Sequence, residues 1–167
     1  TLEDTDGDDT MTINLTNANL LIGNNIVNTR GNNSVAITAG SGGAVTITVD
    51  NEDAAAQSID ATITGSTNIV TLNVTDTVGN AAITTFTKAI SITGNLNINP
   101  TNDETAEVTF DAAVTAGAIV LGDATDAADD TTTVVFEAQT AAHAITGTIN
   151  NAKAADETAI HITDATN

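Results

Sequence analysis

Apolar and polar residues alternate along most of the chain, in short segments separated by turn-forming pairs such as Gly79-Asn80 and Asn99-Pro100. A period of two is typical of β-strands that have one buried face and one exposed face. Threonine occupies many of the exposed positions, where its β-branched side chain favours extended backbone and its hydroxyl stays solvated. The pattern therefore predicts an all-β protein with almost no helix. Its clearest apolar positions are Met11, Ile13, Leu15, Val35, Ile37, Ala39, Val45, Ile47, Val49, Ile59, Ala61, Ile63, Val70, Leu72 and Val74.

The three phenylalanines mark an internal repeat. They are the only aromatic residues in the chain, and the two intervals between them are nearly equal. Isoleucines continue the series backward at similar intervals, and one of two isoleucines extends it forward. Periods of about 20 to 50 residues are typical of stacked architectures, in which each unit buries its apolar face against its neighbours. In chain order the series is Ile13, Ile37, Ile63, Phe86, Phe110, Phe136 and then Ile160 or Ile162.

A repeat of about 24 residues predicts a β-solenoid-like stack of short strands, with successive coils about 4.8 Å apart. Asparagines at matching positions of successive coils could form amide ladders in such a stack. Two tandem immunoglobulin-like β-sandwich domains are the alternative, because strands at spacings of about 8 to 12 residues are equally natural there. The stack would comprise residues 11–167 after an acidic N-terminal segment, residues 1–10. The sandwich alternative divides the chain into residues 11–93 and 94–167.

Charge and composition limit the possible partners. The chain has 22 acidic and three basic residues, a formal net charge of −19, and it contains 33 Thr, 28 Ala and 19 Asn but no Cys. We expect no binding to nucleic acid or to an anionic bilayer, because both need a basic surface. No apolar run is long enough for membrane insertion. Because the first residue is Thr1 and not Met, we expect a processed chain or part of a longer one.

Acidic clusters at predicted turns suggest a role for calcium. The first has the sequence Asp-Thr-Asp-Gly-Asp-Asp, in which carboxylates surround a glycine that permits a sharp bend. Ca²⁺ takes about six to eight oxygen ligands, and this spacing can direct several of them to one ion. Solvated acidic loops without a ligand are the alternative. Weaker candidates are Asp50, Glu52 and Asp53, and Asn102, Asp103 and Glu104. The predicted ligands are Asp4, Asp6, Asp8, Asp9, Asp123, Asp126, Asp129 and Asp130.

Catalytic motifs are weak. Ser41 lies between glycines but lacks the Gly-x-Ser-x-Gly spacing of a nucleophile elbow. His143 and His161 have no cysteine or second histidine at metal-ligand spacing. We therefore do not expect an enzyme.

Two stretches resemble bacterial surface proteins. Residues 70–87, with Val-Thr-Asp followed by Gly-Asn and a Thr-rich strand, resemble the final hairpin of bacterial immunoglobulin-like domains. Residues 108–122 and 134–149 resemble the Thr-, Ala- and Gly-rich β-strand repeats of bacterial surface-layer proteins and large secreted adhesins, including calcium-dependent surface layers of proteobacteria. Both resemblances imply an exported, repetitive, non-catalytic protein of the bacterial cell surface.

Together these observations predict a structural, self-assembling cell-surface protein, a surface-layer or extracellular filament subunit, stabilised by calcium. Its partners would be identical copies of itself in a lattice or filament, and cell-envelope polysaccharide. The alternative is a stalk or binding module of a large secreted adhesin. A polysaccharide-active enzyme and a viral or phage fibre segment are further alternatives.

Overall fold

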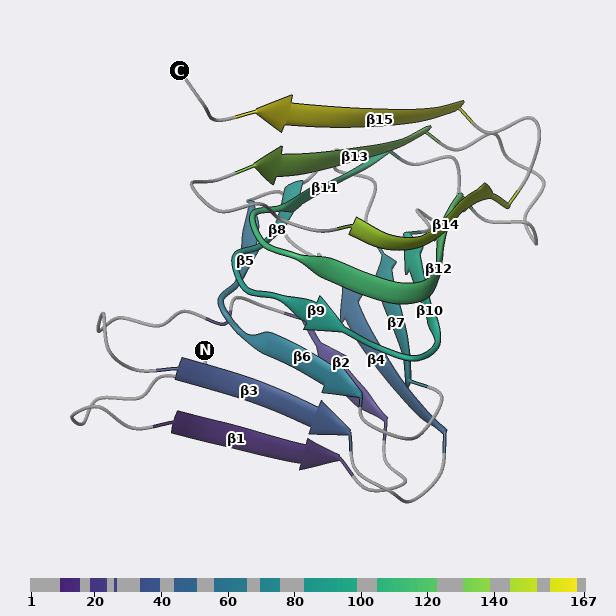
Figure 1. Cartoon of the computed structure of the whole chain (residues 1–167). Coiled ribbons are helices and arrows are strands. Elements are labelled where there is room, and N and C mark those ends of the chain that lie inside the picture. Colours follow the sequence, from purple (N-terminus) through teal and green to yellow (C-terminus); the bar gives the residue numbers. More distant parts are fainter. Residues whose placement is uncertain are drawn as a thin grey trace.

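The alternating segments form short β-strands, and each strand pairs in parallel with strands one coil away in the sequence (Figure 1). The structure is a computed structural model, and it describes residues 10–15, 19–23, 26, 34–39, 44–50, 56–65, 70–75, 83–98, 105–122, 131–138, 145–152 and 157–164. These residues contain no helix. The all-β prediction is confirmed, and the architecture is a β-solenoid.

The strands form three faces around one core. One sheet bends within β12, whose first residues pair with β9 and whose last residues pair with β10, so this sheet supplies two faces. The first face contains β1 (Thr10–Leu15), β3 (Ser34–Ala39), β6 (Thr62–Gly65), β9 (Ile90–Ser91) and the N-terminal parts of β12 (Val114–Leu121) and β14 (Ile145–Asn151). The second face contains β2 (Leu20–Ile22), β4 (Val45–Asp50), β7 (Val70–Thr75), β10 (Asn95–Ile98) and the C-terminal parts of β12 and β14. The third face contains β5 (Gln57–Ile59), β8 (Ile83–Phe86), β11 (Thr105–Phe110), β13 (Thr131–Ala138) and β15 (Glu157–Asp164).

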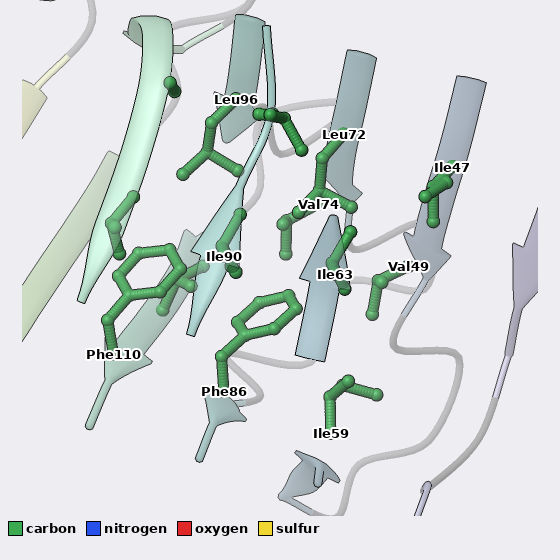
Figure 2. Packing of buried hydrophobic residues seen from close by; sticks show 14 of the residues in the cluster. Ile47, Val49, Ile59, Ile63, Leu72, Val74, Phe86, Ile90, Leu96 and Phe110 are labelled. Carbon is green, nitrogen blue, oxygen red and sulfur yellow. The ribbon is translucent and has the colours of Figure 1, made fainter. Parts of the chain in front are cut away.

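Alternation along each strand decides which side chains enter the core. In β4, for example, Val45, Ile47 and Val49 are buried, whereas Thr46 and Thr48 are half-buried on the outer side. Figure 2 shows inward side chains from all three faces meeting in one cluster, with Phe86 and Phe110 beside Ile63 and Ile90. Because the strands are in register, most buried side chains lie beside a similar one on the next coil.

The phenylalanine repeat is confirmed. Phe110 pairs in register with Phe86 and with Phe136, and the rings stack at centroid distances of 5.3 and 5.4 Å. The forward extension of the series is Ile162, which is opposite Phe136, whereas Ile160 is opposite Val134.

The backward extension of the series through Ile63 is wrong. Phe86 is opposite Ile59 on the third face, and Ile59 in turn bridges to Ile26. Ile63 belongs to the first face, where Ile13, Ile37, Ile63 and Ile90 are aligned. The predicted series joined residues of the first face to residues of the third face. It did so because Ile59 and Ile63 are equally apolar and close together in the sequence.

The immunoglobulin-like alternative is also wrong. Such sandwiches consist of antiparallel strands, whereas all pairings between strands of the described residues are parallel. Strand β7, within the stretch that resembles such a domain, pairs with β4 and β10. The expected amide ladder is confirmed at one step, where the Asn97 Nδ2 donates to the Asn73 Oδ1 over 2.8 Å.

Candidate functional site

The eight predicted calcium ligands, Asp4, Asp6, Asp8, Asp9, Asp123, Asp126, Asp129 and Asp130, all lie outside the described residues. In the sequence, residues 123–130 fall between β12 and β13. Of the weaker candidates, only Asp50 is described, and it is buried at the end of β4. Among the described residues, no three His, Cys, Asp or Glu side chains gather closely enough to hold a metal ion. Calcium binding therefore stays a prediction.

Acidic residues are unevenly distributed among the connections between strands. Ten of the 22 fall, in sequence, between the end of a second-face strand and the start of the next third-face strand. The connections from first-face to second-face strands contain none. In the sequence, acidic residues thus recur in this connection from second face to third face, from the end of β4 onward. They are Glu52, Asp53, Asp76, Asp103, Glu104, Asp123, Asp126, Asp129, Asp130 and Asp156.

One charged group among the described residues has a clear structural role. Asp60 follows β5, and its Oδ1 accepts a hydrogen bond from the Thr87 Oγ1 over 2.8 Å and lies 3.3 Å from the Lys88 Nζ. Lys88 is about half exposed, so the ion pair itself adds little stability. The contacts join the same corner of two successive coils.

Ser41, His143 and His161 were not expected to be catalytic, and only His161 belongs to the described residues. Ser41 and His143 lie outside them, and His161 is exposed on the outer side of β15, opposite Val135.

The outer side of the first face has a continuous column of uncharged polar side chains. Strand register aligns one hydroxyl or amide residue on each of six successive strands, and all but Thr38 are exposed. The third face differs, since Glu107, Glu137 and His161 lie on its outer side. A neutral surface on a chain with charge −19 can approach another molecule without the repulsion that the acidic surface creates. We call it the hydroxyl column, and it consists of Asn14, Thr38, Thr64, Ser91, Thr115 and Thr146.

The last coil leaves core positions exposed. We call β14 and β15 the C-terminal rung, and β1, β2 and Ile26 the N-terminal rung; the two lie at opposite ends of the stack (Figure 1). In the C-terminal rung, Ile149, Ile160 and Ile162 are 42%, 44% and 73% exposed. Their in-register neighbours Ile119, Val134 and Phe136 are buried. Within the described residues, three core columns therefore end in exposed isoleucines.

The repeat predicted that Ile160 or Ile162 is inward-facing, and the register places both of them, together with Ile149, in core columns. What the sequence did not indicate was their exposure, because nothing in the local pattern distinguishes a last coil from an internal one. The hydroxyl column was also missed. Its polar residues are apparent in the sequence, but their alignment depends on the register of distant strands.

Among the described residues there is no helix that could cross a lipid bilayer. Comparison with protein-family models, with curated proteins and with solved structures gave no significant match. The geometry of the chain itself must therefore support any assignment of function.

Proposed function

We propose that this chain is a structural, self-assembling cell-surface protein, a surface-layer or extracellular filament subunit stabilised by calcium. The observation that carries the proposal is the last coil, where Ile149, Ile160 and Ile162 occupy core columns and yet are exposed. Repeat proteins need a polar cap at each end to remain soluble as monomers. An exposed core column favours association, because burying it removes apolar surface from water.

Calcium is part of the proposal because the chain has a large negative net charge. A net charge of −19 on 167 residues opposes close packing of copies, and divalent cations bound by carboxylates would reduce that repulsion. Asp123, Asp126, Asp129 and Asp130 are the favoured ligands in the connection from β12 to β13, with Asp4, Asp6, Asp8 and Asp9 before β1. Location at a bacterial cell surface and attachment to envelope polysaccharide belong to the same proposal.

The test is assembly as a function of protein concentration, with and without calcium. We expect ordered sheets or fibres in electron micrographs, and a higher melting temperature, when calcium is present. Sodium chloride at equal ionic strength is the control, because it screens charge without occupying a site. If neither melting nor association differs between calcium and sodium chloride, the calcium part of the proposal is wrong.

A matched pair of variants tests the predicted ligands. The double variant Asp126→Asn/Asp130→Asn should lose the calcium-dependent rise in melting temperature, because it removes two candidate ligands. Glu107→Gln/Glu137→Gln removes the same charge from third-face strands and should retain the rise. Equal losses in both variants would indicate general charge screening.

The hydroxyl column favours a second candidate, a binding module of a large adhesin. Its neutral, regularly repeated hydroxyl and amide groups suit an uncharged repetitive ligand such as a neutral polysaccharide. Concentration separates the two candidates: a lattice or filament subunit polymerises, whereas an adhesin module stays monomeric and co-sediments with the polymer. The variant Thr64→Lys, in the middle of the column, should abolish such co-sedimentation and leave self-association unchanged.

A further inference from the structure

The C-terminal rung continues core columns of the interior coils with isoleucines, although Asn151 replaces the apolar residue in the column of Leu121. Ile149 continues a core column of the second face, after Leu96 and Ile119. Ile162 continues the phenylalanine column of the third face, after Phe110 and Phe136. Within the molecule, each such position is covered by a parallel strand of the next coil. The surface that best fits this end is therefore another coil of the same kind.

The N-terminal rung of a second copy is such a coil. Ile13, Leu20 and Ile26 begin the same three columns that end at Ile145, Ile149 and Ile162. Ile13 and Leu20 are only partly buried, so two of the columns also have accessible ends at this side of the stack. Within the described part of the chain, β1 and β2 each pair with one strand, as do β14 and β15. Both ends of the stack thus present strand edges that pair with no further described strand, and the strands at the two ends run in the same direction.

Strand direction distinguishes this arrangement from one that joins two C-terminal rungs. Contact between a C-terminal rung and an N-terminal rung continues the parallel pairing that the end ladders of the described residues show. A symmetric contact between two C-terminal rungs would instead join the same face of two copies of β15 in antiparallel pairing. No antiparallel pair occurs between strands of the described residues.

We infer that copies of this chain associate head to tail, the C-terminal rung of one copy against the N-terminal rung of the next, so that the parallel ladders continue across the junction. This inference rests on the proposed self-assembly and specifies its surface. Main-chain hydrogen bonds between strand edges supply affinity, and the apolar columns supply register. Such a contact joins two different surfaces and does not close on itself, so it produces filaments.

The first test changes the exposed end of the phenylalanine column. Ile162→Glu introduces a charge where the side chain is 73% exposed, so the monomer should fold with an unchanged melting temperature. The protein concentration at which assembly begins should rise at least about tenfold, because a charge replaces an apolar contact in the interface. Ile83→Glu is the matched control, since Ile83 is an exposed isoleucine on the outer side of β8, in the middle of the stack. It should assemble as the unaltered protein does.

The second test determines which rungs meet. The chain has no cysteine, so single variants Asn14→Cys and Thr146→Cys introduce one thiol each, at the two ends of the hydroxyl column. Head-to-tail contact brings their Cα atoms to about 4.8 Å, within the range of about 4.4 to 6.8 Å that a disulfide spans. An equimolar mixture should therefore form disulfide-linked heterodimers on oxidation, measured by non-reducing electrophoresis and mass spectrometry.

Each result decides the inference. Rapid cross-linking of Thr146→Cys with itself would mean that two C-terminal rungs meet, and head-to-tail contact would be wrong. Assembly that persists in Ile162→Glu, without heterodimer cross-links, would place the contact elsewhere and leave the proposed self-assembly intact. A chain that stays monomeric at all concentrations, with and without calcium, would overturn both.

Discussion

Inside the solenoid, most side chains contact a residue of similar character one coil away. The rings of Phe86, Phe110 and Phe136 stack nearly parallel, with interplanar angles of 15° and 20°. Their spacing follows the distance between paired strands, about 4.7 to 4.9 Å, and offset stacking of aromatic rings tolerates it. Polar residues follow the same rule, since the buried Thr84 Oγ1 hydrogen-bonds the Gln57 Oε1 over 3.4 Å. A buried polar group without a hydrogen-bond partner should therefore destabilise the fold.

Thr132 carries such a group, although it lies in register with another threonine, Thr158. Its side chain is fully buried on β13, and its Oγ1 has no hydrogen-bond partner among the described residues. Thr132→Val keeps the shape and removes the unsatisfied hydroxyl, so the free energy of unfolding should rise by about 1 kcal/mol. Denaturant titration followed by circular dichroism measures the change. Thr133→Val, on the outer side of the same strand, is the control and should be close to neutral; a loss of stability in Thr132→Val alone would contradict the argument.

The strands are short, between two and eight residues, so a strand pair depends on contacts beyond its own backbone. The Asn73 and Asn97 amides join β7 to β10 on the outer side of the second face. The corner between the first and second faces lies within β12, where a Cβ on Gly117 would approach the Thr93 carbonyl oxygen to 2.9 Å. On the next coil, Gly147 adopts φ of +143°, which other residues rarely adopt. Side-chain ladders thus join successive coils, and glycines allow β12 and β14 to turn from the first face to the second.

A double-mutant cycle tests the asparagine ladder. Asn73→Ala and Asn97→Ala should each lower the free energy of unfolding by about 0.5 to 1.5 kcal/mol, the net value of a typical hydrogen bond. The double variant should cost less than the sum of the two, because each single variant already removes the shared bond. The same cycle on Thr46 and Thr71, adjacent outer residues of β4 and β7, provides the comparison. Strict additivity for the asparagine pair would mean that the bond contributes nothing to stability.

At the scale of the whole molecule, a cohesive apolar core is opposed by charge. The buried cluster extends through all three faces, from Leu15 near one end to Phe136 near the other. The net charge of −19 acts against it, because like charges on a compact chain repel one another. The balance between core cohesion and charge repulsion depends on the salt concentration, because salt shortens the range of the repulsion.

Salt should therefore stabilise the fold. Raising sodium chloride from about 0.01 to 0.15 M shortens the Debye length from about 30 to 8 Å. The resulting gain of about 1 kcal/mol should raise the melting temperature by about 2 to 4 °C for a chain of this size. Thermal melts followed by circular dichroism, at a protein concentration below the onset of assembly, measure the effect. A melting temperature that is constant or falls with salt would show that repulsion between carboxylates does not limit stability.

The sequence alone determined the class of fold, because alternation is a local consequence of the pleated strand. It also determined that the three phenylalanines occupy one position of a repeat, since no other aromatic residue competes for that position. The sequence alone did not determine how the other core columns are aligned. The first-face column advances by unequal steps, of which the step from Val114 to Ile145 is the longest, so no constant period describes it. In chain order this column is Ile13, Ile37, Ile63, Ile90, Val114 and Ile145.

Only the tertiary structure decided which face each apolar residue joins and where the core is exposed. Ile59 and Ile63 have the same local pattern, and pairing with strands of the next coil assigns them to different faces. Ile162 resembles any inward isoleucine, and it is exposed because no strand of the described residues covers β15 on its outer edge. Alternation depends on neighbouring residues in one strand, whereas register and burial depend on the strands that lie beside it.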